Sequence, residues 1–200
     1  MHERAWQRRG FRLVAGVDEV GRGPLAGPVV AGAVILPAGD PPWLDALRDS
    51  KQLGRARREL LAALIREEAL AYGLGVVPAQ RIDAIGIAPA SREAMRRAVD
   101  RLRPAAGALL LDAFALPEVD LPQQAIVRGD ACCSAIAAAS IVAKVARDRL
   151  MARLDQRFPG YGFFHNQGYG TAEHLSALWR LGPCTIHRFT FAPVRRAASL

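Results

Sequence analysis

Residues 13–36, LVAGVDEVGRGPLAGPVVAGAVIL, constrain the fold more strongly than any other stretch of the chain. An apolar run over residues 13–17 leads into two adjacent carboxylates, Asp18 and Glu19, and a second apolar run covers residues 29–36. Short apolar runs bounded by Gly and Pro are typical of buried strands, so this stretch predicts a strand, a turn and a second strand. Charges at the end of a core strand are costly to bury unless they are paired or bound to a metal ion. A cation is therefore the partner that this pattern favours.

The turn between the two apolar runs carries Gly21, Arg22 and Gly23. The flanking glycines let the backbone approach a ligand closely, while the guanidinium group can reach a phosphate. Taken separately, the acidic pair and the glycine turn are most simply interpreted as a solvated turn. The glycine spacing in GRGPLAG is also not that of a dinucleotide-binding turn. Only the combination of these features indicates a site.

The rest of the chain alternates between helical and strand patterns. Apolar spacing predicts helices over residues 55–71, 91–102, 131–157 and 172–181, with Ser91 as a helix N-cap. Strands are predicted over residues 73–77, 107–111 and 125–127. The front half of the helix from residue 131 is small and apolar, so it can lie very close to a sheet. The pattern indicates one α/β domain over residues 1–200, built on a mixed sheet packed with helices.

Composition indicates which partners and which cellular compartment suit this domain. The formal net charge of +8 favours polyanionic partners, although basic surface helices alone would also account for it. The three cysteines match neither a disulfide framework nor a zinc site. Apolar runs stay well short of the ~20 residues of a membrane helix, and the N-terminal MHERAWQRRG lacks the apolar segment of a secretory signal. We therefore expect a reduced, cytoplasmic protein without membrane association, and a monomer.

Two further acidic residues share the setting of the first pair. Asp112 ends the apolar run over residues 107–111, and Asp130 stands where the long helix is expected to begin. Alone, Asp112 would be a turn residue and Asp130 a helix N-cap. Polar residues at strand ends of an α/β sheet lie at the edge where sites form, and carboxylates gathered there repel one another without a cation. Mg²⁺ suits such a group, because it binds a few carboxylate oxygens together with water and phosphate oxygens.

One geometric difficulty concerns the adjacent pair. Neighbouring side chains of a regular strand point to opposite faces, so Asp18 and Glu19 cannot project the same way from an ideal strand. Either the strand twists or bulges at this point, or the longer Glu19 side chain reaches round the strand edge.

Several motifs in a fixed order closely resemble those of bacterial ribonuclease HII, the type 2 ribonuclease H family. Besides the opening stretch, they are DSKQL, LLLDA, GDACCSAIAAASIVAKVARDRLM, GYGTAEHL and HRFTFAP, and the resemblance runs over residues 11–194. It implies a ribonuclease H-like fold, with a five-stranded mixed sheet flanked by helices. The core would cover about residues 11–157, and a small C-terminal helical extension about residues 158–200.

The same resemblance implies the activity. It is that of a two-metal-ion endonuclease, dependent on Mg²⁺ or Mn²⁺, that cuts the RNA strand of RNA–DNA hybrids and single ribonucleotides embedded in duplex DNA. The products would carry a 3′-OH and a 5′-phosphate, and the biological role would be ribonucleotide excision repair.

Site residues follow by position in the matching motifs. The metal-binding and catalytic carboxylates implied are Asp18, Glu19, Asp112 and Asp130. The substrate-binding residues implied are Gly21, Arg22, Gly23, Lys51 and Tyr169. Physical chemistry agrees with two of these roles, because close backbone amides can read a 2′-OH and an aromatic ring between glycines can stack on a sugar or base. A half-buried core tyrosine and a surface lysine are the simpler interpretations of Tyr169 and Lys51 alone.

The chain departs from the family pattern at three places. Residues 164–167, FHNQ, replace a lysine-rich segment before the GYGT motif, Ala113 stands in place of the usual glycine, and Gly86 replaces an asparagine. We expect these changes to affect substrate affinity rather than the reaction. Lys144 and Asp148 are expected to form an intrahelical pair, and His187 with Arg188 to fix the C-terminal segment.

Three alternative functions stay open from the sequence. The chain could bind hybrids without cutting them, be another nuclease of the same fold that cuts DNA junctions, or act on small phosphate esters. The intact carboxylates disfavour the first alternative, and the lack of a phosphate-binding loop motif disfavours the last.

Overall fold

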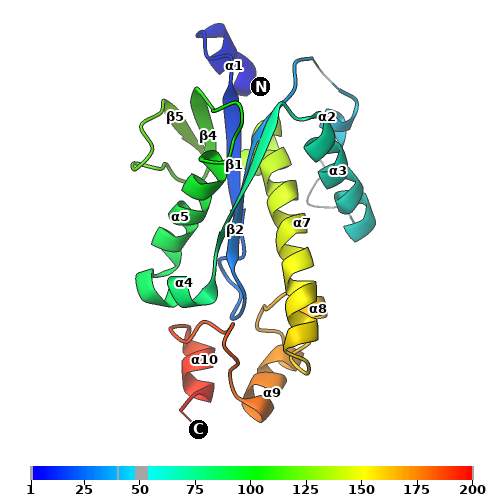
Figure 1. The fold of residues 1–200 in the computed structure, drawn as a ribbon, viewed down its shortest axis with the longest axis vertical. Helices are drawn as coiled ribbons and strands as arrows, with labels where there is room; N and C mark the ends of the chain where they lie inside the picture. Colours follow the sequence, from blue (N-terminus) through cyan, green and yellow to red (C-terminus); the bar gives the residue numbers. More distant parts are fainter. Residues whose placement is uncertain (1, 40, 48–53, 200) are drawn as a thin grey trace.

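A five-stranded mixed sheet forms the centre of the protein, seen in a computed structural model that describes residues 2–39, 41–47 and 54–199 (Figure 1). Its strands are β1 (Val14–Val20), β2 (Val29–Ile35), β3 (Ala71–Val77), β4 (Ala108–Asp112) and β5 (Gln123–Ile126). Their order across the sheet is β3-β2-β1-β4-β5. Strands β1, β2 and β3 pair antiparallel, whereas β4 and β5 run parallel to β1. The expected five-stranded mixed sheet is thereby confirmed.

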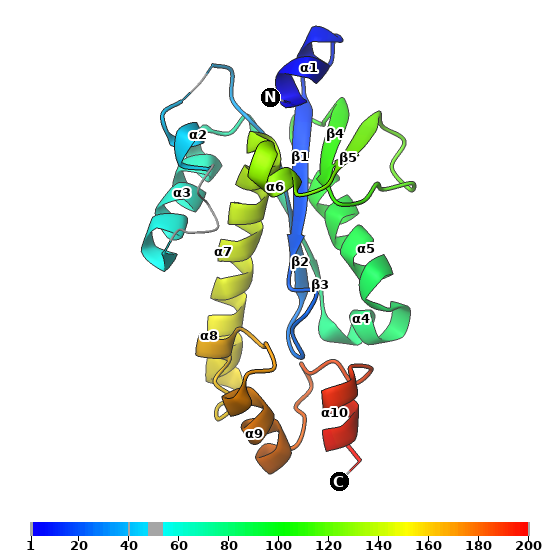
Figure 2. The same ribbon diagram turned by 180° about the vertical axis from the view of Figure 1, so that it is seen from behind.

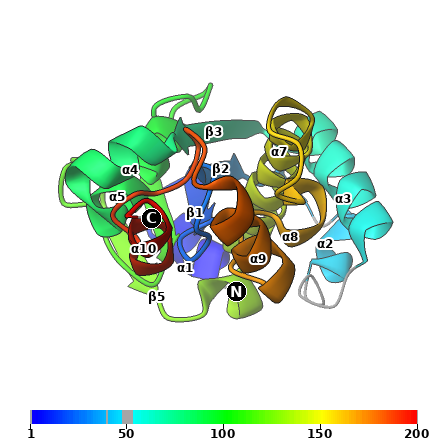
Figure 3. The ribbon, with the colours of Figure 1, turned by 90° about the horizontal axis from the view of Figure 1, so that it is seen from below.

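Helices cover both faces of this sheet (Figures 1 and 2). The helices of the described residues are, in chain order, α1 (His2–Arg8), α2 (Trp43–Ala46), α3 (Arg55–Glu68), α4 (Ala79–Ile85), α5 (Ile87–Val99), α6 (Gly129–Cys132), α7 (Ser134–Arg157), α8 (Phe163–Asn166), α9 (Ala172–Leu181) and α10 (Ala192–Ala197). Helix α5 packs on one face, and α7 with α3 packs on the other (Figure 3). No helix within the described ranges is long and apolar enough to cross a membrane.

Helix α7 lies in direct contact with the backbone of β1 and β2. A Cβ atom placed on Gly16 would lie 2.0 Å from the carbonyl carbon of Ala135, and one on Gly32 would lie 2.4 Å from the carbonyl oxygen of Ala139. Only glycine fits at such a close approach, and the small residues of α7 supply the other side. The expected close packing of this helix is confirmed, and it fixes α7 over the end of β1 that carries the acidic pair.

The structure corrects two expected helix boundaries. Ser91 is not an N-cap, because α5 already begins at Ile87, after Gly86 with φ 82°, and Ser91 is buried inside it. Pro89 falls in the first turn of α5, where the missing N–H has no intrahelical role. The helix expected over residues 131–157 is divided at Cys133, which is extended (φ −130°, ψ 116°) and separates α6 from α7.

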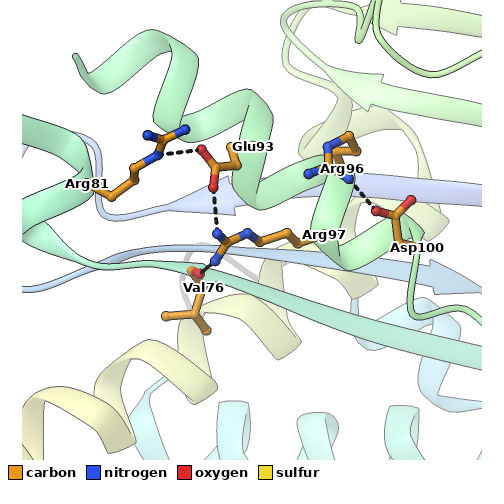
Figure 4. A network of polar contacts seen from close by, with 6 residues as sticks. All are labelled: Val76, Arg81, Glu93, Arg96, Arg97 and Asp100. Atoms are coloured by element: carbon orange, nitrogen blue, oxygen red, sulfur yellow. Dashed lines mark hydrogen bonds and ion pairs between the residues drawn. The ribbon is translucent and has the colours of Figure 1, made fainter. Parts of the chain in front are cut away.

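Strand β3 is one edge of the sheet, and two arginines, Arg97 in α5 and Arg101 just after it, bond to its backbone. Arg97 donates to the carbonyl oxygen of Val76 at 2.7 Å, and Arg101 donates to that of Leu74. Glu93 holds Arg97 through an ion pair of 2.6 Å and also binds Arg81 (Figure 4). These side chains occupy backbone acceptors that an edge strand would otherwise offer to another strand.

The C-terminal part packs against the connection between β1 and β2. Leu25 lies in one apolar cluster with Leu178 and Val194, and Ala26 lies in another with Phe163 and Ala177. Helices α9 and α10 therefore sit beyond the end of the sheet at which this connection turns (Figure 1). The division into a core and an extension near residue 158 stays a prediction.

Candidate functional site

Asp18 is a buried carboxylate on the α7 face of β1. Its residue is 6% exposed, its Oδ1 atom accepts a hydrogen bond from the backbone N–H of Glu19 at 2.8 Å, and its carboxyl group also bonds the Ser140 side chain. Burial raises the pKa of Asp18 to about 7; the Ser140 hydrogen bond opposes this rise, and the charges of Glu19 and Asp112 add to it. Acidic side chains are therefore gathered at this end of β1.

Glu19 approaches the same place from the other face of the strand. Pairing of β1 with β2 continues without interruption through Asp18 opposite Gly32 and Glu19 opposite Ala31, so this ladder has no bulge there. Burial raises the pKa of Glu19, the ion pair with Arg22 opposes the rise, and the charge of Asp112 adds to it. The shared interaction with Asp112 favours the interpretation that Glu19 reaches round the strand edge.

Arg22 is bound to Glu19, one member of the acidic pair, in this structure. Its Nη1 atom lies 3.1 Å from Oε1 of Glu19, and its guanidinium carbon lies 5.4 Å from the ring centroid of Phe114. The Arg22 side chain remains 45% exposed, so one side of the guanidinium group still faces solvent. A phosphate could thus reach Arg22 from outside.

Asp112 bonds the backbone of Gly129, the residue that precedes Asp130. Asp112 ends β4, next to β1 in the sheet, and its Oδ1 atom accepts a hydrogen bond from the N–H of Gly129 at 2.7 Å. Asp130 is the next residue and lies inside the short helix α6, whose N-cap is Arg128. The simpler interpretation of Asp130 as a helix N-cap is therefore wrong.

The donor set fits a divalent cation in its chemistry. Burial raises the pKa values of Asp18 and Glu19, and the charge of Asp112 adds to the rise in both. Among the described residues, however, no three Asp, Glu, His or Cys side chains have the geometry of a ready-made metal site. Glu19 is engaged by Arg22 instead.

A cleft of about 440 Å³ runs along α7, and of the four candidate carboxylates Asp130 lines it. It is lined by Asp130, Ser140, Lys144, Arg58 and Tyr169, among others. The expected pair of Lys144 with Asp148 is confirmed at 2.6 Å, so Lys144 presents a positive charge held in place beside the cleft. The cleft combines the Asp130 carboxylate with the cations Arg58 and Lys144 and the aromatic ring of Tyr169.

Tyr169 and the glycine turn lie side by side. A Cβ atom on Gly23 would lie 3.7 Å from Cε1 of Tyr169, and the Tyr169 residue is 44% exposed. The simpler interpretation of Tyr169 as a half-buried core aromatic is therefore wrong, and its ring is available to a ligand. Lys51 lies outside the described residues.

Sequence patterns did not reveal Ser140 or Phe114 as parts of the site. Ser140 bonds Asp18, and Phe114 supports Arg22. The signal for Ser140 was its place as a polar residue in the apolar AIAAASIVAKV run, four residues before Lys144. Residues at that spacing share one face of a helix.

Comparison with known proteins decides the family. The family model described as ribonuclease HII matches residues 15–194. The chain belongs to the ribonuclease HII family. A curated ribonuclease HII from Dehalococcoides mccartyi is 51% identical over 196 residues, covering 96% of this chain and 92% of the relative.

Solved structures agree with this family. The ribonuclease H2 from Pyrococcus horikoshii superposes with a TM-score of 0.79 at 27% identity, covering 93% of this chain and 97% of that one. Bst-RNase HIII, solved in complex with Mn²⁺, superposes with a TM-score of 0.72 at 21% identity, covering 94% of this chain and 69% of that one. The second likeness shows the fold, which is the expected ribonuclease H-like fold.

As a member of the ribonuclease HII family, the protein is an endonuclease. It cleaves the RNA of RNA–DNA hybrids and ribonucleotides within DNA, as the motifs led us to expect. Family membership excludes the small phosphate-ester enzyme and the DNA-junction nuclease that the sequence left open.

Proposed function

We propose that this ribonuclease HII uses Asp18, Glu19, Asp112 and Asp130 as its metal-binding and catalytic residues, with Mg²⁺ or Mn²⁺ as the cofactor. One observation carries the proposal: Asp18, Glu19 and Asp112 interact in a buried site where burial and like charge raise carboxyl pKa values. A divalent cation relieves that repulsion. Asp130 is included from its motif and from its position next to Gly129, whose N–H bonds Asp112.

When bound, divalent ions would activate water for in-line attack and offset charge on the leaving 3′-oxygen. The protein's own part is to fix the carboxylates on a rigid frame: Asp18 through Ser140 and the Glu19 amide, and Asp112 through Gly129. Cleavage on the 5′ side of a ribonucleotide–deoxynucleotide step would leave a 3′-OH and a 5′-phosphate.

In this proposal, Arg22 couples substrate binding to the availability of Glu19 for a metal ion. Its guanidinium group pairs with Glu19, and Glu19 becomes available to an ion when that pair is released. The half-exposed guanidinium group of Arg22 would then pair with a substrate phosphate in place of Glu19.

The glycine turn and Tyr169 supply recognition in this proposal. Backbone amides near Gly21 and Gly23 would read the 2′-OH, and the exposed ring of Tyr169 beside Gly23 would stack on the neighbouring sugar or base. Lys51 is proposed as a further substrate contact from its motif alone. We also propose a monomer that acts in the cytoplasm in ribonucleotide excision repair.

A nicking assay tests this function directly. A duplex DNA with one embedded ribonucleotide is incubated with the protein in Mg²⁺, in Mn²⁺ and in chelator, with an all-DNA duplex as the matched control. We expect one nick at the ribonucleotide in either metal, a 3′-OH that a polymerase extends without prior end repair, and no product in chelator. Equal cutting in chelator would contradict the metal proposal, and equal cutting of the all-DNA duplex would contradict the recognition proposal.

A further inference from the structure

Two arginines lie fully buried between the β1–β2 connection and the C-terminal part of the chain. Arg147 on α7 and Arg188, after α9, are both 0% exposed. Burial lowers the pKa of both guanidinium groups, that of Arg188 to about 9 with the charge of Arg147 contributing. Removing a cation from water is costly unless hydrogen bonds replace the lost solvation. Their partners therefore show what these side chains hold together.

Arg188 binds the glycine turn through its backbone. Its Nη2 atom donates to the carbonyl oxygen of Gly21 at 2.6 Å, and its Nη1 atom donates to that of Arg22 at 2.8 Å. Both Nε and Nη2 also donate to the carbonyl oxygen of Gly27. One guanidinium group thus fastens both ends of the connection that carries the turn.

Arg147 binds the same connection and the segment that precedes Tyr169. Its Nε atom donates to the carbonyl oxygen of Pro28 at 3.0 Å and its Nη2 atom to that of Ala26 at 3.2 Å. Its Nη1 atom donates to the carbonyl oxygen of Gln167 at 2.9 Å. Arg147 is therefore a bridge between two segments that are far apart in the sequence.

Close contacts leave little freedom between these parts. A Cβ atom on Gly21 would lie 2.2 Å from Nε of Arg147, so the turn rests on the guanidinium group itself. The N–H of Leu25 donates to the carbonyl oxygen of Gly168 at 2.7 Å, directly beside Tyr169. The Leu25–Gly168 hydrogen bond and the hydrogen bonds of the two arginines thus hold Tyr169 next to Gly23.

We propose that Arg147 and Arg188 are positioning residues for ribonucleotide recognition, fixing the Gly21–Gly23 turn and Tyr169 at one spacing so that both engage the same nucleotide step. This inference rests on the recognition roles proposed above. Neither arginine touches the substrate, because both are enclosed by backbone carbonyls. Their guanidinium groups can satisfy several carbonyls at fixed angles, which a lysine ammonium group on a flexible stem cannot.

A double-mutant cycle between Arg147 and Tyr169 tests the inference. The variants are Arg147→Lys, Tyr169→Ala and the two combined, with kcat and KM measured on the single-ribonucleotide duplex. We expect each single variant to lower kcat/KM by about ten-fold or more, with KM carrying most of the loss for Arg147→Lys. The combined loss should fall short of the product of the single losses by about three-fold or more, because Arg147 acts through Tyr169.

Controls separate positioning from a general loss of structure. Arg149→Lys changes an exposed arginine of the same helix, paired with Glu59, and should leave kcat/KM within about two-fold. Divalent-ion affinity, measured by calorimetry without nucleic acid, should also stay within about two-fold in Arg147→Lys, because that variant leaves the carboxylates in place. If Arg147→Lys does not fold, Arg188→Lys enters the same cycle, paired with Arg22→Ala.

The outcomes distinguish this inference from the proposed function. Single losses that multiply in the combined variant, or a loss of ion binding in Arg147→Lys, would overturn the positioning role alone. An unchanged kcat/KM in Tyr169→Ala would overturn the proposed role of Tyr169, and the positioning inference with it.

Discussion

The carboxyl group of Asp18 lies near those of Glu19 and Asp112, because β1 and β4 are neighbours in the sheet. Strand patterning predicted that Asp18, Glu19 and Asp112 end neighbouring apolar runs, and the structure brings their charges together. The pattern could not show Ser140 as the hydrogen-bond partner of Asp18, because that contact depends on how α7 lies over the sheet. The positions of Asp18, Glu19 and Asp112 were thus predictable because each follows directly from its place at the end of a strand.

Ala113 offers a test at the scale of one residue. It follows Asp112 with φ 61°, in the left-handed region that favours glycine, and its sequence position is one where the family usually has glycine. We expect Ala113→Gly to raise the free energy of unfolding by up to about 1 kcal/mol, because the strain of a Cβ atom outweighs the added freedom of the unfolded chain. Urea denaturation measures this change.

The matched control for this change is Ala198→Gly. Ala198 has φ −77°, so its replacement relieves no strain and should not stabilise the protein. A lower unfolding free energy for Ala113→Gly than for the parent protein would contradict the interpretation of Ala113 as strained.

Secondary structure was predictable where the chain has long apolar runs, as in β1, β2 and α7, or a clear apolar face, as in α3. Short helices such as α8 and α10 were missed, because they carry too few apolar positions to show a period and are stabilised by tertiary contacts. The break at Cys133 was missed for a related reason: no Pro or Gly marks it in the sequence, and the contact of α6 with Asp112 through Gly129 is a tertiary one.

Edge strand β3 gives a prediction at the scale of one element. Replacing both Arg97 and Arg101 with Ala exposes the carbonyl groups of Val76 and Leu74, so we expect the variant to self-associate more readily at raised concentration. Light scattering over a concentration series measures this. Arg96→Ala is the control, because Arg96 pairs only with Asp100 among the contacts drawn in Figure 4. Equal scattering by both variants would contradict the protective role.

A chain of hydrogen bonds through two buried histidines crosses the C-terminal part. The N–H of Cys184 donates to Nδ1 of His187 at 3.0 Å, Nε2 of His187 lies 3.1 Å from Nε2 of His174, and Nδ1 of His174 lies 2.8 Å from the carbonyl oxygen of Tyr169. One proton between the two Nε2 atoms satisfies this chain only when both rings are neutral.

The histidine pair predicts lower stability in mild acid. Burial, with the His174 ring contributing, lowers the pKa of His187 from 6.5 to about 4, and burial lowers the pKa of His174. The unfolded chain therefore binds more protons than the folded one between about pH 4 and 6.5, so stability falls as pH falls through this window. We expect a loss of roughly 2 kcal/mol from His187 between pH 7 and pH 5 in urea denaturation.

His187→Gln removes the titrating ring and should flatten this pH dependence. His165→Gln changes an exposed histidine and should leave it as in the parent protein. A pH dependence that survives His187→Gln unchanged would contradict the assignment.

Contacts between the β1–β2 connection and the C-terminal segment join distant parts of the chain. Arg188 bonds Gly21, so residues 167 positions apart in the chain complete one turn. Sequence motifs predicted that His187 and Arg188 fix the C-terminal segment, and this is confirmed. The motifs could not show which carbonyl groups Arg188 binds, because every residue has a backbone carbonyl and its side chain gives no sign of this contact.

The net charge of +8 gives a prediction for hybrid binding as a function of salt. We expect affinity to fall steeply with salt concentration, and Lys144→Ala to lower the magnitude of the log–log slope by roughly 1, since Lys144 lines the cleft beside Asp130. Arg96→Gln, on α5 across the sheet, should leave the slope unchanged. An unaltered slope in Lys144→Ala would remove this residue from the contact surface.

Cleavage and binding by Asp112→Asn together test the central claim, that separated carboxylates converge on shared divalent ions. The variant keeps an oxygen to accept the Gly129 N–H but loses the charge that an ion requires. We predict that nicking of the single-ribonucleotide duplex in Mg²⁺ falls by on the order of 10³-fold or more, while hybrid affinity stays within a few-fold of the parent protein. Undiminished nicking by Asp112→Asn would contradict the account.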